Sequence, residues 1–147
     1  MSQCYLEAVR ECDQTVNPLF RFLGARLALA EAGKAVIVMP ITGNLRQGGG
    51  KVAGGILATL ADESMAHAVL SLLDPCQDIV TVEMNIRYLR SADPDKGGEL
   101  LASAEVVKNG RTLTMASAEV HDSTGRLLAT AGATFHTHPG RPVSQNG

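Results

Sequence analysis

The stretch Ala53-Gly54-Gly55-Ile56-Leu57-Ala58-Thr59-Leu60-Ala61-Asp62 begins the segment that decides the fold. From residue 54 to residue 73, apolar side chains recur at helical spacing, which predicts a helix about 30 Å long that ends before Asp74-Pro75. One stripe of this helix carries Leu57, Leu60, Ala61, Ser64, Ala68 and Leu72. The other faces are nearly as apolar, so we expect the helix to be surrounded by protein.

The segments available to surround this helix have the pattern of strands. Apolar and polar residues alternate over 79–89, 99–108, 111–121 and 127–136, and a short β-branched run over 35–39 precedes the helix. Asn109-Gly110 predicts a two-residue hairpin turn, so the last three strands form an antiparallel meander. Only an antiparallel sheet curled around the helix can cover it, which places the chain in the α+β class.

The remainder of the chain adds little to this layout. Residues 5–23 have the pattern of a helix that is broken or restarted at Asn17-Pro18 and ended by Gly24. A length of 147 residues suits one domain. We expect that domain, including its N-terminal helix, over residues 1–138, followed by a flexible tail over 139–147.

Composition excludes several classes of function. Thirteen Lys and Arg against fifteen Asp and Glu give a net charge of −2, and aromatic residues are only 3% of the chain, so no nucleic-acid partner is expected. Asp62, Glu63 and His67 in the middle of the one long apolar stretch exclude a membrane span. Three cysteines without CxxC spacing, and an N-terminus without signal-peptide features, predict reduced thiols in a cytoplasmic protein.

A glycine-rich loop over 43–51 precedes the central helix. It does not match a phosphate-binding loop, because Gly49 stands where that motif needs Lys. The run from Gly48 to Ala53 fits a dinucleotide-binding pattern formally, but a meander rather than a βαβ unit follows it. Gly54-Gly55 opens the helix, where free N–H groups and the helix dipole are suited to polarise a carbonyl oxygen. A plain flexible entry to the helix explains the pair equally well.

Asp62 lies two turns into the apolar helix, where a carboxylate is costly unless it has a partner. It is a candidate general base or nucleophile. The alternative is a structurally satisfied or solvent-facing residue, and the exposed position suits the neighbouring Glu63 better. Gly54 and Asp62 are eight residues apart, about 12 Å along a helix, so one reacting carbonyl cannot contact both within one chain. A catalytic role for both requires at least a dimer with shared sites.

Residues 53–62 resemble the HGG…LAD helix of hotdog-fold acyl-CoA thioesterases, especially the PaaI-like branch related to 4-hydroxybenzoyl-CoA thioesterase. Thr81-Val82-Glu83-Met84-Asn85-Ile86-Arg87-Tyr88-Leu89-Arg90 is similar to the T/S…N…YLRPA strand of that branch, and Val106-Val107-Lys108-Asn109-Gly110-Arg111 to its hairpin. The resemblance spans residues 18–136. It implies the hotdog fold, a long helix wrapped by a curved antiparallel sheet, in homodimers or dimers of dimers.

The resemblance also implies hydrolysis of an acyl-CoA thioester without a cofactor. By resemblance, Gly54 gives its N–H to the thioester carbonyl, Asp62 activates water or attacks as a nucleophile, and Thr81 helps to hold the water. The candidates for substrate binding, the last three for the phosphates of CoA, are Gly55, Gln47, Asn44, Arg90, Lys108 and Arg111.

Several positions depart from the family pattern. Ala53 stands where the family usually has His, and Gln47 lies nearer than Asn44 to the place of the family's Asn. By strict alternation along its strand, Thr81 shares a polar face with Glu83, so a solvent-facing residue is an alternative interpretation.

His67, His136 and His138 are expected at the surface, and without an acidic partner nearby they predict no metal site.

Three other functions are alternatives to thioester hydrolysis. The first is a non-catalytic hotdog protein that binds acyl-CoA. The others are a hydratase or dehydratase, which generally needs a His beside the carboxylate, and a purely structural assembly protein.

Overall fold

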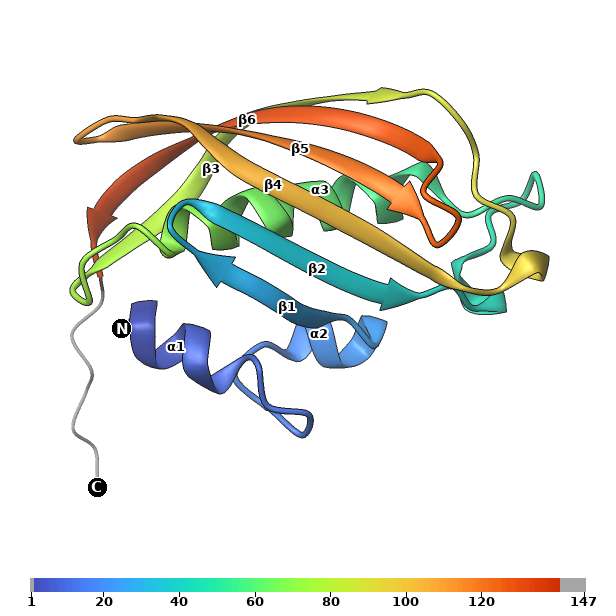
Figure 1. Ribbon diagram of the computed structural model, residues 1–147, viewed down its shortest axis with the longest axis horizontal. Helices are drawn as coiled ribbons and strands as arrows, with labels where there is room; N and C mark the ends of the chain where they lie inside the picture. The colour runs from blue at the N-terminus through green and yellow to red at the C-terminus, as the bar shows by residue number, and fades with distance from the viewer. Residues whose placement is uncertain (1, 141–147) are drawn as a thin grey trace.

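The computed structural model describes residues 2–140, in which one curved antiparallel sheet wraps a long helix (Figure 1). The helix, α3 (Gly54–Leu70), runs along the concave side of the sheet. The strands are β1 (Arg26–Glu31), β2 (Lys34–Pro40), β3 (Gln77–Tyr88), β4 (Glu99–Asn109), β5 (Leu113–Asp122) and β6 (Leu127–Pro139), in the order β1-β2-β4-β5-β6-β3. The predicted α+β class and hotdog architecture are confirmed.

The buried side of α3 forms the centre of the core. Its buried residues are Leu57, Leu60, Ala61, Ser64, Met65, His67, Ala68 and Val69. They pack mainly against the inner faces of β2, β4 and β5, and full burial of a side chain such as Leu60 stabilises the fold by about 1.5–3 kcal/mol. The helix ends three residues before the predicted residue 73, so Leu72 leaves the predicted stripe and is 39% exposed.

The N-terminal region differs from the single predicted helix. It forms two short helices, α1 (Ser2–Ala8) and α2 (Pro18–Leu23), joined by a non-helical segment. The break follows the predicted signal, because the Asn17 side chain caps α2 by accepting from the Phe20 N–H at 3.1 Å and Pro18 fills the first helical position. Gly24 ends α2 in the left-handed conformation, with φ of 68°, as expected.

Two turns differ in detail from the sequence prediction. The extended region before α3 contains two strands rather than one, because Ala32 and Gly33 both adopt positive φ and form a tight turn between Glu31 and Lys34. The sheet therefore has six strands instead of five. The turn after Asn109 is longer than the two residues predicted, because Asn109 still pairs with Thr114.

The ends of the described chain bear on two further expectations. Pro139 still belongs to β6, and the Gly140 N–H donates to the Cys76 carbonyl at 2.7 Å. Residues 141–147 of the predicted tail lie outside the described residues, so the boundary of that tail stays a prediction. Within residues 2–140, no helix has the length and apolarity that a membrane crossing requires.

A buried histidine attaches α1 to α3. His67 is 2% exposed and stacks on Phe20 with ring centroids 5.1 Å apart, so its expected place at the surface is wrong. Its Nδ1–H donates to the Glu63 carbonyl at 2.7 Å, which leaves Nε2 to accept from the Tyr5 hydroxyl at 3.0 Å. The Asn17 side-chain amide in turn donates to Tyr5. The sequence missed this role because His67 lies off the stripe of aliphatic residues.

We predict that protonation of His67 weakens the fold in acid. Burial lowers the pKa of His67 to about 4, so the stability that the neutral ring contributes is present above pH 6.5 and is lost as pH falls through 4. The contribution is about 3 kcal/mol. His67→Phe keeps the ring and removes the titration, so the wild-type advantage in unfolding free energy should shrink by that amount between pH 6.5 and 4. An advantage that does not change with pH would contradict this account.

Candidate active site

The first part of the site is the N-terminus of α3. Ala53 caps the helix with its backbone only, and among the hydrogen bonds of the described residues none uses the N–H of Gly54 or Gly55. These two N–H groups stand at the positive end of the helix dipole. The Tyr88 hydroxyl donates to the Gly54 carbonyl at 3.1 Å, and its ring lies so close that a Cβ on Gly54 would be 3.2 Å from it. Tyr88 therefore fixes the first peptide of the helix from the side of β3.

A pocket at this end of the helix collects some of the predicted substrate-binding residues. It is lined by Gln47, Lys51, Val52, Gly54, Leu57, Tyr88, Leu89, Arg90 and Ser91. Gln47 and Arg90 thus line the same pocket as Gly54. The Arg90 guanidinium donates a hydrogen bond to the Leu127 carbonyl at 3.0 Å, which fixes its position. Gly55 is the exposed neighbour of Gly54.

Three other candidates lie away from this pocket. Asn44 belongs to the short 3-10 helix η1 (Gly43–Leu45) and does not line the pocket. Lys108 and Arg111 lie at the β4–β5 turn, which is beside His136 at the far end of β6 from Leu127. His136 follows Leu127 by nine steps along the strand, a distance of about 30 Å. Within one chain, Arg111 is therefore not brought to the same ligand as Arg90.

The second part of the site is a carboxylate–hydroxyl pair. The Thr81 hydroxyl donates to Asp62 Oδ1 at 2.9 Å. Asp62 is half-buried, and the pair opens into a shallow pocket that Ala58, Thr59 and Met84 also line. A hydrogen-bonded carboxylate at an open apolar pocket is suited to accept a proton from a water molecule or to attack a carbonyl carbon.

A β-bulge explains why Thr81 reaches Asp62. The pairing of β3 with β6 shifts between Thr81 and Glu83, so Thr81 is opposite the buried Phe135 whereas Glu83 is opposite Thr134. The extra residue, Val82, turns Thr81 toward α3 and Glu83 toward the outer face. Strict alternation placed both residues on the polar face, whereas the bulge puts Thr81 on the inner face of the sheet; its side chain is nevertheless exposed in one chain, as the alternative interpretation expected.

The two parts lie on one helix but do not meet within one chain. Gly54 is the first residue of α3 and Asp62 the ninth, so they remain about 12 Å apart along its axis. If one carbonyl has to contact both residues, a second copy of the chain is still needed, as the spacing predicts.

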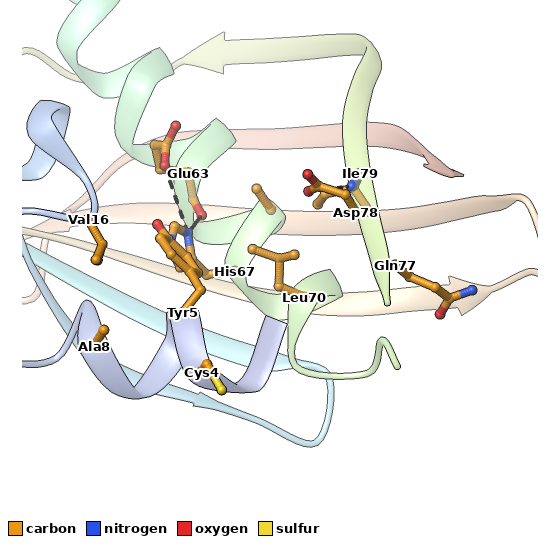
Figure 2. Close-up of a pocket in the computed structure, with 11 residues that line it drawn as sticks. Cys4, Tyr5, Ala8, Val16, Glu63, His67, Leu70, Gln77, Asp78 and Ile79 are labelled. Carbon is orange, nitrogen blue, oxygen red and sulfur yellow. Dashed lines mark hydrogen bonds and ion pairs between the residues drawn. The ribbon is translucent and has the colours of Figure 1, made fainter. Parts of the chain in front are cut away.

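A third feature is a half-open cavity of about 580 Å³ between α1, α3 and the start of β3 (Figure 2). Its lining residues are Cys4, Tyr5, Ala8, Val16, Glu63, Ala66, His67, Leu70, Gln77, Asp78 and Ile79. Figure 2 shows Tyr5 and His67 side by side below Glu63. Ala66 is one helical turn beyond Asp62, and Ile79 is two strand residues before Thr81, so the cavity adjoins the carboxylate–hydroxyl pair.

Glu63 is the perturbed carboxyl of this region. Its side chain is only 25% exposed, so the expected solvent-facing position is wrong. Burial and, to a smaller extent, the charge of Asp62 raise the pKa of Glu63, a hydrogen bond from Asn17 opposes them, and the resulting pKa is about 7. No pattern in the sequence indicated this environment, because α1 and its following loop, which cover Glu63, lie far away along the chain.

The remaining histidines and the three cysteines lie at or near the surface. No group of three or more His, Cys, Asp or Glu within 2–140 is placed to hold a metal ion. His136 and His138 stack with ring centroids 6.3 Å apart, and His136 is exposed, as expected. Cys4, Cys12 and Cys76 are exposed free thiols.

Tyr88, Glu63 and Tyr5 are the residues of the site that sequence reasoning missed. Tyr88 carried a signal, because it follows Met84 and Ile86 at alternate positions on the inner face of its strand. Glu63 and Tyr5 carried none, since their contact depends on how α1 docks.

Comparison with known proteins identifies the family. The model of the thioesterase superfamily matches residues 49–129. Human acyl-coenzyme A thioesterase 13 is 30% identical over 138 residues, covering 92% of this chain and 96% of the relative. The crystal structure of a thioesterase family protein from Silicibacter pomeroyi is 33% identical with a TM-score of 0.81, covering 92% of this chain and 99% of that one. The PaaI protein of E. coli shares the fold, with 24% identity, a TM-score of 0.76, and coverage of 84% of this chain and 86% of its own.

The matched region includes the start of α3, Asp62 and the bulged strand, which are the parts from which the site is built. The similarity also extends over almost the full length of the relatives. This chain therefore belongs to the thioesterase superfamily and is a thioester hydrolase of the hotdog fold.

Proposed function

We propose that the protein hydrolyses acyl-CoA thioesters with Asp62 as the general base or nucleophile and the Gly54 N–H as the donor to the thioester carbonyl. The observation that carries the proposal is the Thr81–Asp62 hydrogen bond of 2.9 Å at an open pocket, on the same helix whose first N–H groups are unpaired. The substrate class rests on the resemblance in sequence and on the name of the human relative.

The chemistry follows from these groups. The Gly54 N–H withdraws electron density from the carbonyl oxygen and stabilises the oxyanion that forms when the carbon is attacked. Asp62 takes a proton from a water molecule that Thr81 helps to position, the new C–O bond forms, and the C–S bond breaks. The proton then passes to the CoA thiolate. Direct attack by Asp62 would instead form an anhydride that water hydrolyses.

Tyr88 accounts for the missing imidazole. The family's usual His is replaced by Ala53, whose side chain makes no cap hydrogen bond. The Tyr88 hydroxyl donates to the Gly54 carbonyl, which belongs to the Gly54–Gly55 peptide, so this contact orients the peptide that directly follows the Gly54 N–H at the helix entry. We propose that Tyr88 positions the oxyanion donor in this chain, with Gln47 and Arg90 binding the substrate at the same pocket.

The edge of the sheet supports a shared site. β3 is the last strand of the sheet, twelve residues long, with the apolar Val80 and Val82 more than half exposed. An unpaired apolar edge of this length is a template for pairing with another chain. Antiparallel pairing of two β3 strands would place α3 of one copy beside α3 of the other, so that Gly54 meets the partner's catalytic carboxylate. We propose a homodimer of this kind, alone or in a dimer of dimers.

The location is inferred from the thiols. Cys4, Cys12 and Cys76 are free and exposed, the state in which a reducing compartment keeps cysteines, and we propose that the protein is cytoplasmic.

A protein that binds acyl-CoA without hydrolysing it is the alternative that Ala53 suggests, since a side chain on which the family relies is absent, but membership of the thioesterase superfamily favours hydrolysis. Two measurements on the same acyl-CoA distinguish hydrolysis from binding without hydrolysis. Hydrolysis gives release of free thiol from acyl-CoA, whereas mere binding gives a higher thermal midpoint with no thiol.

Replacement of the carboxylate should abolish turnover. We expect Asp62→Asn to lower kcat by about 10³-fold, because the amide cannot accept the proton. Thr81→Val should lower kcat by about tenfold, because Asp62 loses the hydrogen bond that the threonine hydroxyl donates. Thr59→Val is the matched control, since Thr59 lines the same pocket but donates to the Gly55 carbonyl and not to Asp62. Thiol release measures all three, and full activity of a folded Asp62→Asn protein would refute the mechanism.

The oxyanion donor can be removed without removing the helix. Gly54→Pro deletes the N–H at the first helical position, which favours proline, and Ala53 already has φ of −60° and ψ of 135°, as a residue before proline requires. We expect kcat to fall by about 10²-fold. Gly54→Ala brings a Cβ to the same place against Tyr88 but keeps the N–H, so it should remain far more active. Equal loss in both variants would assign the effect to the Cβ.

A shared site predicts complementation. Gly54→Pro and Asp62→Asn proteins should each be inactive, but a heterodimer of the two contains one site in which both residues are intact. Mixing the chains under conditions that allow exchange should restore up to half of the wild-type activity per heterodimer. Mixtures that stay inactive although heterodimers are detected by mass would show that each site lies within one chain.

A further inference from the structure

The cavity under α1 adjoins the proposed reaction centre on two elements at once. Ala66 follows Asp62 by one helical turn, about 5.4 Å, on α3. Ile79 precedes Thr81 by two residues, about 6.6 Å, on β3 and faces the same way. An acyl group whose carbonyl sits at Asp62 therefore has this half-open cavity as an adjoining space for its far end. Its volume of about 580 Å³ is within the range of small-molecule sites.

The charged groups around this cavity are all acidic. Glu63 and Asp78 line it and Asp62 lies next to it, whereas no Lys or Arg is among the described lining residues. His67 does not supply a positive charge, because burial lowers its pKa to about 4. Tyr5 stays neutral, since burial raises its pKa above the usual value and its hydroxyl donates to His67.

Glu63 is the carboxyl in the deepest position. It faces Tyr5 from α1 and Asn17 from the segment before α2, and its Oε2 is 3.8 Å from His67 Nδ1 on α3. Across the cavity, β3 adds only Asp78 as a charged group. A second carboxylate brought into this space would meet like charges in an environment of low polarity and would find no cation with which to pair.

We propose that this cavity receives the acyl group and that Glu63 determines specificity by excluding acyl groups that end in a carboxylate. The inference rests on the proposed function and narrows its substrate class to acyl-CoA thioesters whose acyl end is uncharged. Repulsion of the wrong substrate, rather than an added contact to the right one, gives the selectivity.

The selectivity should depend on pH. The pKa of Glu63 is raised to about 7, so the side chain is mostly protonated at pH 6 and mostly ionised at pH 8. Discrimination against a carboxylate-ended acyl group should therefore increase through pH 7. A ratio of kcat/KM for two thioesters cancels the pH dependence of the reaction itself, since both use the same catalytic groups.

The test compares hexanoyl-CoA with adipyl-CoA, which share a six-carbon chain and differ in a terminal carboxylate. For the full chain we expect kcat/KM to favour hexanoyl-CoA by roughly ten- to a hundredfold at pH 8, and by less at pH 6. Glu63→Gln should remove most of this preference at pH 8, together with its pH dependence. Glu7→Gln, the same change on the exposed side of α1, should keep both. Benzoyl-CoA and its 4-carboxy derivative form a second pair for ring-shaped acyl groups.

The possible outcomes separate the inference about Glu63 from the proposed acyl-CoA hydrolysis. Hydrolysis of both members of a pair at equal efficiency by the wild type at pH 8 would overturn the inference and leave the proposed function intact. An unchanged preference of the Glu63→Gln variant for the uncharged thioester would also overturn the inference about Glu63. Failure of the wild type to release thiol from any of the four thioesters would overturn the proposed function itself.

Discussion

An apolar helix of seventeen residues has to be surrounded, and one curved sheet covers α3 on only part of its circumference. The strands β2, β4 and β5 pack on the fully buried side. On the other side, Ala58, Asp62 and Ala66, spaced one turn apart, are only half-buried, and α1 and the edge strand β3 border them. The proposed reaction centre thus lies where the covering of the helix is incomplete, because that face is still open to a ligand or to a second copy.

Two adjacent carboxyls are brought into different environments by this partial covering. Asp62 faces the open pocket and accepts a hydrogen bond from Thr81, whereas Glu63 points under α1, where burial raises its pKa to about 7. Successive residues on a helix differ in direction by about 100°, so one step along the chain is enough to move a side chain from the solvent-facing side to the enclosed side. Neighbouring carboxyls in unlike surroundings can take unlike roles, here chemistry for one and selection of the acyl group for the other.

The sequence predicted those features that depend on local pattern. The central helix, its glycine entry, the strands after it and the position of Asp62 all follow from periodicity and from the residues at element ends, and the resemblance added the hotdog fold. The predictions that were wrong concern features that depend on contacts between distant segments. The bulge at Val82 reverses the face of Thr81. Docking of α1 buries both His67 and Glu63, and no residue near them along the chain signals that it will do so.

The short helix α1 has a consequence of its own for the behaviour of the protein. Seven residues are too few to form a stable helix in isolation, so α1 exists because it packs against α3 and donates from Tyr5 to His67. The same helix forms one wall of the cavity. A molecule that fills the cavity must therefore favour the docked arrangement, and by thermodynamic linkage the docked arrangement must favour that molecule. Ligand occupancy and the docking of α1 are in this way two aspects of one equilibrium.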